Sequence, residues 1–151
     1  MADRVLKQPL PEEEIRRLCR SALDMRSRSY VPYSHFRVGA AVLTEDGQIF
    51  TGCNIENAAY SVTICAERVA LTKAISEGYR RFAAIAIAGG REGGPLKYCP
   101  PCGTCRQLMS EFCGGDFPVY LPKAEDDWKA YTLEQLLPER FGPGDLNRDQ
   151  A

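Results

Sequence analysis

The sequence lacks three features that would assign it to whole classes of protein. Its 151 residues contain no run of about 18 apolar residues, the length that a membrane-spanning helix needs. Residues 1–8 have no apolar core of the signal-peptide type. Basic residues are not in excess, because 19 Lys and Arg stand against 20 Asp and Glu, whereas proteins that neutralise phosphates concentrate positive charge. We therefore expect a protein of the cytoplasm, with the nucleus as a second compartment, that has no membrane and no nucleic acid as a partner.

The length and composition of the chain are those of one folded domain. A chain of this length buries about 68–70% of the surface that it exposes when unfolded, so it needs no disulfide scaffold. Charged residues make up 26% and hydrophobic residues 44%, a balance typical of folded rather than disordered chains. We expect residues 1–151 to form a single domain in which residues 1–10 and 147–151 are flexible.

Apolar periodicity and turn signals predict helices and strands that alternate along most of the chain. We expect helices from Pro11 to Met25 and at Cys65–Glu77, Cys102–Cys113 and Leu133–Leu137. We expect strands at Phe36–Leu43, Gln48–Cys53, Phe82–Ala88, Phe117–Leu121 and Trp128–Thr132. Asp46-Gly47 marks a hairpin between the first two strands. This order predicts an α/β fold, a three-layer α-β-α sandwich whose mixed five-stranded sheet is covered by helices on both faces.

The seven cysteines carry the most information about function. In a reducing compartment, clustered cysteines favour metal binding or catalysis over disulfides. Cys65 begins one predicted helix, and Cys102 and Cys105 lie three apart at the start of another, where both thiols can face one side. The positive helix ends favour thiolates. Three thiolates could bind zinc and leave the fourth position to water, as catalytic zinc sites do.

Two charged residues follow the first of these cysteines. Glu67 could lie beside the metal, take a proton from water and deliver it to a substrate; the alternative is a carboxylate that only complements the helix dipole. Arg68 could donate hydrogen bonds to thiolate sulfur and offset the negative charge of three thiolates bound to one divalent ion. The alternative for Arg68 is an ordinary surface residue of a helix.

Cys99 leaves a second interpretation of the cysteines open. It forms an overlapping Cys-x-x-Cys pair with Cys102, so a structural zinc site of four cysteines is the alternative to a catalytic one. A redox role for Cys-x-x-Cys would leave Cys65 and Glu67 unexplained. His35, the only histidine, is interpreted as a structural turn residue and not as a ligand.

Together with other segments, these residues resemble the zinc-dependent cytidine deaminases, specifically their small homotetrameric type that acts on free nucleosides. Cys-x-Glu followed by Pro-Cys-x-x-Cys is the general signature of zinc deaminases, in which the glutamate is not a ligand. The resemblance runs from about Pro11 to Leu146. The segments that carry it are Pro32–Ser34, Phe36–Ala41, Gly52–Ala58, Cys65–Arg68, Pro101–Gln107, Leu136–Pro138 and Phe141–Pro143.

The resemblance implies a role for each candidate site residue. It implies one Zn²⁺ per subunit on Cys65, Cys102 and Cys105, with Glu67 as the proton shuttle. The implied substrate contacts are Phe36 stacked on the pyrimidine, Asn54 and Glu56 on the ribose, Ala58 in the same motif, Tyr60 at the sugar end, the Ala66 backbone on the base, and Phe141 closing over the base of a neighbouring subunit. For Phe36 a core position and for Asn54 a turn position are the alternatives.

The implied function is the hydrolytic deamination of cytidine and deoxycytidine to uridine and deoxyuridine with release of ammonia, in pyrimidine salvage. The implied assembly is a homotetramer with sites shared between subunits. The segment Ala59–Ile64 and the glycine-rich loop Gly89–Pro101 depart from the family pattern. Three other functions stay open: a polynucleotide deaminase, a deaminase of nucleotides or antibiotic nucleosides, and a zinc-stabilised interaction module without activity.

Overall fold

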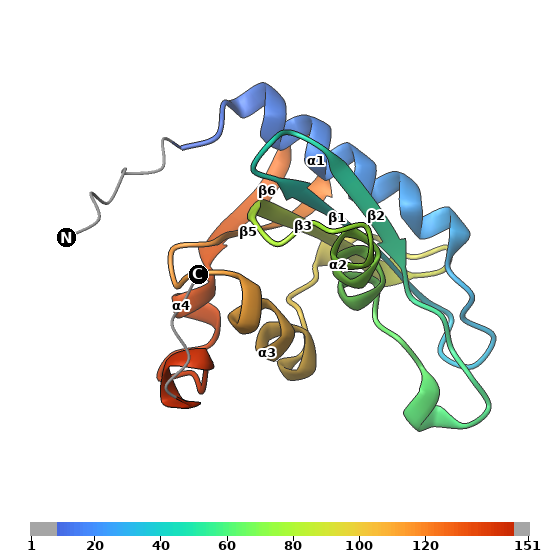
Figure 1. Cartoon of the computed structure of the whole chain (residues 1–151). Coiled ribbons are helices and arrows are strands. Elements are labelled where there is room, and N and C mark those ends of the chain that lie inside the picture. The colour runs from blue at the N-terminus through green and yellow to red at the C-terminus, as the bar shows by residue number, and fades with distance from the viewer. Residues whose placement is uncertain (1–8, 147–151) are drawn as a thin grey trace.

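A computed structural model describes residues 9–146 of the chain (Figure 1). The predicted flexibility of residues 1–10 and 147–151 therefore falls almost entirely outside the described residues. Leu10 is described, and it packs partly buried beside the first helix. Within residues 9–146, none of the helices combines the length and the apolar character that a membrane span requires.

One mixed sheet forms the middle layer of the fold. Its main path runs β2-β1-β3-β5-β6, and β4 pairs with β3 beside this path. Within residues 9–146, β3 and β5 pair in parallel, whereas the pairs β1–β2, β1–β3, β3–β4 and β5–β6 are antiparallel. The strands are β1 (Phe36–Thr44), β2 (Ile49–Cys53), β3 (Phe82–Arg91), β4 (Lys97–Tyr98), β5 (Pro118–Ala124) and β6 (Asp127–Thr132).

The prediction of five strands was one strand short. The sheet has six strands, and the additional one is β4, which has only two residues. β4 lies in the glycine-rich segment that was predicted to be a loop, and it pairs Tyr98 with Ala88 and Lys97 with Gly89. Two residues cannot show the alternation of apolar and polar side chains by which a strand is identified in a sequence.

Helices cover both faces of the sheet, as predicted (Figure 1). α1 (Glu12–Met25) packs on one face, where its buried residues join those of β1 and β3. α2 (Ala66–Ser76) and α3 (Gly103–Phe112) pack on the other face around a larger apolar cluster. The short α4 (Leu133–Leu136) follows β6 and begins with a capping box from Thr132 and Gln135. Three 3₁₀ helices complete the order: η1 (Arg26–Arg28), η2 (Tyr60–Val62) and η3 (Pro143–Leu146).

Two glycines allow the helices to approach the sheet closely. A Cβ atom added to Gly39 of β1 would lie 2.0 Å from the carbonyl oxygen of Ala22 in α1. A Cβ added to Gly52 of β2 would lie 2.4 Å from the carbonyl oxygen of Ala66, the first residue of α2. The backbone at the start of α2 therefore rests directly on β2, which fixes the position of this helix N-terminus.

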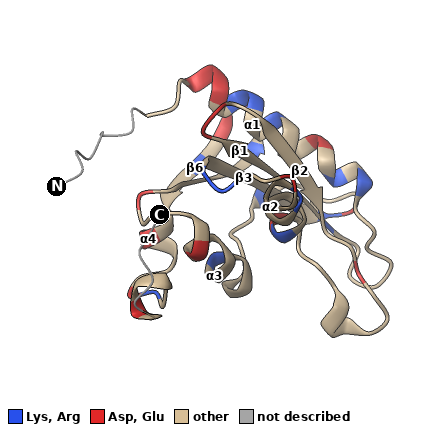
Figure 2. Cartoon of the chain, in the orientation of Figure 1, with Lys and Arg blue, Asp and Glu red and all other residues tan. Residues whose placement is uncertain are grey.

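The arginines of α1 belong to a mixed-charge surface. Arg16 donates to Glu12 at 2.7 Å within the helix, and Arg20 donates to Glu125 at 2.7 Å. Figure 2 shows basic and acidic residues interspersed along α1. This arrangement fits a solvated helix face and not a phosphate-binding stripe.

Candidate metal centre

Two cysteines stand at the N-termini of the two helices that share one face of the sheet. Cys65 occupies the N-cap position of α2 and Cys102 that of α3, each with extended backbone angles. No side chain caps either helix, so the first backbone N–H groups keep their positive potential toward these thiols. Cys105, within the first turn of α3, is completely buried. The predicted placement of all three thiols at helix starts is confirmed.

The three sulfur atoms have the spacing of a metal site. Cys65 Sγ lies 3.7 Å from Cys102 Sγ, which lies 3.5 Å from Cys105 Sγ. All three lie within 4.8 Å of one another. A tetrahedral zinc site with Zn–S bonds of about 2.3 Å places its sulfurs about 3.8 Å apart. The thiols therefore fit zinc without a rearrangement of the backbone.

No fourth side-chain donor joins this group within residues 9–146. The group of potential ligands there consists of Cys65, Cys102 and Cys105 alone. Cys99 is directed elsewhere, because its Sγ would lie 2.5 Å from a Cβ added to Gly89 of β3. A three-sulfur site with one open position is the pattern of catalytic zinc, whereas structural sites are closed by four protein ligands.

Glu67 is the buried acid of the site. Glu67 is only 4% exposed. Burial and, to a smaller extent, the negative charge of Cys65 raise the pKa of its carboxyl group to about 7. A hydrogen bond with the Cys105 thiol lowers this pKa and only partly offsets the rise. A carboxyl group whose pKa lies near neutrality can both accept and release a proton at physiological pH. A mere helix-dipole partner would stand in water at the helix surface, so burial favours the general acid–base interpretation.

The thiols and Arg68 are electrostatically coupled. The pKa of Cys65 is lowered to about 5, chiefly because the Cys105 thiol donates a hydrogen bond to it, with further help from Arg68. The pKa of Cys105 is raised by the same hydrogen bond and by burial. Arg68 Nη2 donates to the Thr63 carbonyl at 3.1 Å and lies 3.9 Å from Cys65 Sγ. Among the described residues, the buried Arg68 Nε has no hydrogen-bond partner. The guanidinium charge beside Cys65 is therefore not neutralised by a carboxylate bound to this nitrogen and favours the thiolate form of the cysteine.

Asn54 joins the end of β2 to the start of β1. Its Nδ2 donates to the Phe36 carbonyl at 2.8 Å, and its Oδ1 accepts from the Val38 N–H at 2.9 Å. A side-chain amide has two N–H donors and two acceptor lone pairs. One donor and one lone pair of Asn54 therefore remain for a ligand while the rest hold the strand that begins with Phe36.

Glu56 holds the turn that precedes Phe36. Its Oε1 accepts from the backbone N–H groups of Tyr33 at 3.0 Å and Ser34 at 3.1 Å. The pKa of Glu56 is lowered, first by a hydrogen bond from the Ser34 side chain and then by these backbone N–H groups. The carboxylate thus stays ionised and keeps acceptor capacity for another hydroxyl group.

Phe36 borders a cavity of about 370 Å³. Its residue is 37% exposed, so it is not the core phenylalanine that was the alternative. A Cβ added to Gly89 would lie 3.2 Å from Phe36 Cε1, which places the ring edge close above the backbone of β3. The other residues that line the cavity belong to the end of β3, the following loop and β4, namely Gly89, Gly90, Arg91, Gly94, Pro95, Lys97, Tyr98, Cys99 and Pro100.

The remaining predicted residues lie in different places. Ala66 is buried at the start of α2, whereas Ala58 is exposed. Tyr60 is 75% exposed and packs edge-on against Tyr33, with 5.8 Å between the ring centroids. Phe141 is 59% exposed, and its carbonyl accepts from Gln107 of α3 at 2.8 Å. Tyr60 is the first residue of η2, and Phe141 comes shortly before η3. Figure 1 shows η2 and η3 on opposite sides of α2 and α3.

Arg106 is a supporting residue that the sequence analysis did not single out. Its Nε donates to the Pro101 carbonyl at 2.8 Å, and its Nη1 donates to the Leu136 carbonyl. It therefore ties the residue before Cys102 to α4. Its position directly after Cys105 was the only available signal.

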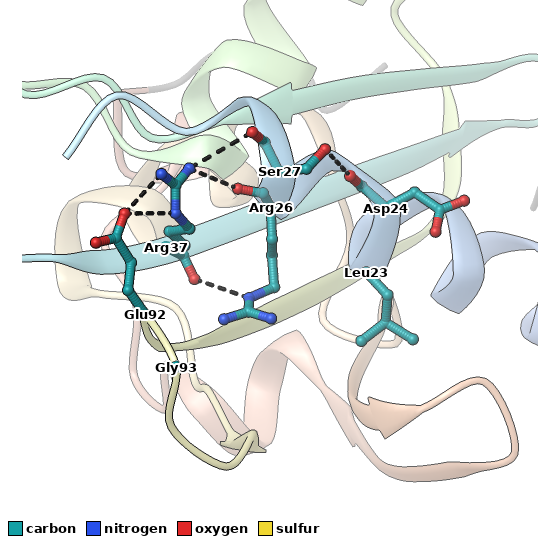
Figure 3. Close-up of a pocket in the computed structure, with 7 residues that line it drawn as sticks. All are labelled: Leu23, Asp24, Arg26, Ser27, Arg37, Glu92 and Gly93. Atoms are coloured by element: carbon teal, nitrogen blue, oxygen red, sulfur yellow. Dashed lines mark hydrogen bonds and ion pairs between the residues drawn. The ribbon is translucent and has the colours of Figure 1, made fainter.

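A second hollow lies away from the thiols. This open groove of about 780 Å³ is formed where α1 ends beside β1 and β3 (Figure 3). Its lining residues include none of the predicted site residues; they are Leu23, Asp24, Arg26, Ser27, Arg37, Glu92 and Gly93. The groove is therefore distinct from the candidate metal centre.

Sequence comparisons place the chain in a family that has a zinc-binding region. Residues 12–121 match the family described as "Cytidine and deoxycytidylate deaminase zinc-binding region". A cytidine deaminase of Sporosarcina psychrophila is 48% identical over 134 residues, which cover 89% of this chain and 96% of that protein. A cytidine deaminase of Mycobacterium tuberculosis is 38% identical over 141 residues, covering 93% and 99% of the two chains.

Solved structures agree with the sequence comparisons. The crystal structure of a cytidine deaminase from Burkholderia pseudomallei matches with a TM-score of 0.74 and 44% identity, covering 83% of this chain and 97% of that chain. The cytidine deaminase structure from Mycobacterium tuberculosis matches with a TM-score of 0.71 and 38% identity, covering 83% and 95%. With three clustered thiols, a buried glutamate and these matches, the chain belongs to the cytidine and deoxycytidylate deaminase family that has a zinc-binding region.

Proposed function

We propose that this chain is a zinc-dependent cytidine deaminase that hydrolyses cytidine and deoxycytidine to uridine and deoxyuridine with release of ammonia. The reaction belongs to pyrimidine salvage, and its place is the cytoplasm. The observation that carries the proposal is the convergence of three thiols on one point with the buried Glu67 beside them. An interaction module would need a closed set of ligands, and a fourth thiol would be the natural way to supply it.

In this proposal Cys65, Cys102 and Cys105 hold one zinc ion per subunit. The chemistry that bound zinc supplies is Lewis acidity, which makes a water molecule a stronger acid. Three thiolates leave the site with net negative charge, and Arg68 offsets part of it from beside Cys65. The dipoles of α2 and α3 act in the same direction.

Glu67 moves the protons of the reaction. Its carboxylate takes a proton from the attacking water and passes it to N3 of the pyrimidine, so that the ring can accept the electron pair at C4. It then helps to protonate the amine that leaves from C4. One water molecule is consumed and one ammonia is released, so the proton count balances with Glu67 back in its starting state.

Phe36, Asn54 and Glu56 bind the nucleoside. Phe36 offers a partly exposed ring face for stacking on the pyrimidine, and Ala66 presents its backbone to the base. Asn54 and Glu56 offer their remaining donor and acceptors to the sugar hydroxyls, while Ala58 and Tyr60 border the sugar end. We expect both cytidine and deoxycytidine to react.

The direct test follows the absorbance of cytidine with the purified protein, with and without a zinc chelator. The expected result is a loss of cytidine absorbance that the chelator abolishes and added zinc restores. Stable absorbance with the zinc-loaded protein would reject the proposed function. Parallel kinetics with deoxycytidine test the sugar tolerance, and reaction of only one nucleoside would overturn it.

We further propose a homotetramer whose sites are shared between subunits. Within residues 9–146, seven large apolar side chains are at least two-fifths exposed and are available for burial against another subunit; they are Tyr30, Tyr33, Ile55, Tyr60, Val62, Phe141 and Leu146. In this arrangement Phe141 of one subunit closes over the base bound by another. The exposed segment that carries Tyr60 forms part of the contact.

Mixing two inactive variants tests this sharing of sites. Glu67→Gln removes the proton shuttle, and Phe141→Ala removes the side chain that closes a neighbouring site. Mixed tetramers should contain some sites with an intact Glu67 and an intact Phe141 from different subunits, so activity should reappear. Recovery of no activity in tetramers that native mass spectrometry shows to be mixed would contradict sharing, and a monomer at micromolar concentration would contradict the assembly.

The competing deaminase functions differ in their substrates. A polynucleotide deaminase would need a basic channel and aromatic platforms for single strands, whereas this chain has a net charge of −1. A gel shift with single-stranded oligonucleotides should show no complex. Turnover of cytidine monophosphate that exceeds turnover of cytidine would favour a nucleotide substrate instead.

A further inference from the structure

Phe36 lies at an exposed strand end, although stacking on a pyrimidine requires a fixed ring plane. It is the first residue of β1, and its residue is 37% exposed. One side of the ring is open, so packing alone leaves the ring orientation underdetermined. Within the backbone, the Phe36 N–H donates to Ser34 Oγ at 3.0 Å and its carbonyl accepts from Asn54 at 2.8 Å. Phe36 also pairs with Arg91 of β3 in the sheet, and the contacts of its chain neighbours, His35 and Arg37, add to this pairing.

The residue before Phe36 has a strained backbone. His35 has a φ of 56°, in the left-handed region that side chains other than glycine rarely adopt. Such a conformation persists where surrounding contacts impose it. Two of these contacts come from Glu92: its N–H donates to the His35 carbonyl at 2.8 Å, and its Oε2 lies 3.3 Å from His35 Nδ1.

The residue after Phe36 is held by the same glutamate. Arg37 Nε donates to Glu92 Oε1 at 2.7 Å, and Arg37 Nη2 lies 2.6 Å from that oxygen. Arg37 Nη1 also donates to the backbone carbonyls of Ser29 at 2.8 Å and Arg26 at 3.2 Å. Figure 3 shows Glu92 and the backbone of Arg26 and Ser27 in η1 converging on the Arg37 guanidinium. This ion pair is therefore anchored to the body of the fold, unlike most surface pairs.

Arg26 adds a second tie between the same elements. Its Nε donates to the Arg37 carbonyl at 3.1 Å, and its Nη2 donates to the Gly90 carbonyl at 3.2 Å. The start of β1 is thus fastened to the end of β3 on the face that carries α1. The Phe36 ring lies near Gly89 of the same strand, so a shift of this junction would move the ring.

We propose that Glu92 is a positioning residue for pyrimidine binding, because it holds His35 and Arg37 on both sides of Phe36 and thereby fixes the stacking ring. The proposal rests on the proposed function. Glu92 lines the groove of Figure 3, whose lining residues include none of the three thiols, and in this proposal it acts on the substrate through Phe36. Stacking on an aromatic ring stabilises the bound substrate and the transition state equally, and loss of such uniform binding raises KM and leaves kcat unchanged.

The experiment compares Glu92→Ala with Glu125→Ala. Glu125 accepts from Arg20 Nε at 2.7 Å in a more exposed ion pair that involves neither His35 nor Arg37, which makes it a control for the loss of a surface carboxylate. For Glu92→Ala we expect KM for cytidine to rise about 3- to 10-fold, the range for one well-oriented aromatic contact, with kcat and zinc content within about twofold of wild type. Glu125→Ala should leave all three unchanged. Glu92→Gln, which keeps one acceptor oxygen, should show a smaller rise in KM and serves as the conservative variant.

A double variant tests whether Glu92 acts through the ring. Once Phe36→Ala has removed the ring, Glu92→Ala should raise KM no further. The proposal is overturned if Glu92→Ala behaves like Glu125→Ala, if its effect adds fully to that of Phe36→Ala, or if it lowers kcat without changing KM.

A readout without turnover separates this proposal from the proposed function. In protein with labelled phenylalanine, the Phe36 ring resonance, assigned with Phe36→Tyr, should shift or broaden in Glu92→Ala and stay unchanged in Glu125→Ala. An unchanged resonance in Glu92→Ala rejects the positioning role even if wild type turns over cytidine. A shifted resonance in a protein that does not deaminate cytidine would reject the proposed function alone.

Discussion

Two completely buried cysteines on opposite faces of the sheet, Cys19 and Cys105, have contrasting surroundings. On the face that carries α1, Cys19 is completely buried among apolar neighbours, and burial raises the pKa of its thiol to about 12. On the face that carries α2 and α3, Cys105 is equally buried, but it meets two other thiols at two helix N-termini. There the pKa of Cys65 is lowered to about 5. Burial alone therefore makes a thiol inert, and its neighbours make it a potential ligand.

The largest expected difference between the faces is in metal content. Cys102→Ala removes one of the three sulfurs, so we expect zinc to fall to a small fraction of one ion per chain and deamination to fall below detection. Cys19→Ala, which removes a neutral thiol from the opposite face, should keep zinc and activity. Elemental analysis of both purified variants measures the difference. Equal zinc in both would remove the distinction between the faces.

The next largest effect isolates chemistry from metal binding. Glu67→Gln keeps the size of the buried side chain but removes the proton acceptor, so kcat should fall by about 10²- to 10⁴-fold while zinc stays bound. Glu77→Gln, at the exposed C-terminal end of the same helix, is the control and should change nothing. Turnover by Glu67→Gln near that of wild type would show that another group moves the protons.

A smaller effect concerns the charge beside the thiolates. Arg68→Met keeps the long apolar stem and removes the guanidinium near Cys65, so zinc affinity should fall about 10- to 100-fold, as for other residues that support metal ligands. Competition with a chromophoric chelator measures the affinity. Arg16→Met is the control, because Arg16 forms its ion pair with Glu12 of the same helix and not with a thiol. Unchanged affinity in Arg68→Met would make Arg68 a merely structural residue.

The smallest effect is expected at Cys99. This thiol packs on Gly89 and stands apart from the three clustered sulfurs, and burial raises its pKa to about 11. Cys99→Ala should therefore keep one zinc per chain, which metal analysis checks. Loss of zinc would revive the four-cysteine structural site.

Most of the fold could be predicted from local sequence signals. Helix starts with proline or cysteine, apolar periodicity and the Asp46-Gly47 hairpin each act over a few residues, so the helices and the five longer strands were found close to their observed bounds. The parallel pairing of β3 with β5 was not predicted, because it depends on the packing of segments 34 residues apart in the register Ile85 to Val119. β4 was missed because two residues are too few to show the alternation of apolar and polar side chains that identifies a strand.

The candidate site also contains residues that the sequence predicts and contacts that it does not. The three thiols and Glu67 sit at helix starts that the sequence marks, so their convergence could be anticipated once both helices were placed on one face. The contacts of Asn54 with the backbone of β1 and the pairing of Arg37 with Glu92 join residues distant in sequence. The sequence does not specify such contacts, because each of these polar side chains could equally well have been hydrated.

The coordination of zinc in the purified protein tests the central claim most directly. X-ray absorption at the zinc edge counts the sulfur and the lighter donors around the metal. We predict three sulfurs at about 2.3 Å and one oxygen or nitrogen donor, the latter being exchangeable with a ligand. Four sulfurs around the ion would contradict the account, because a closed site has no position at which water could become the nucleophile.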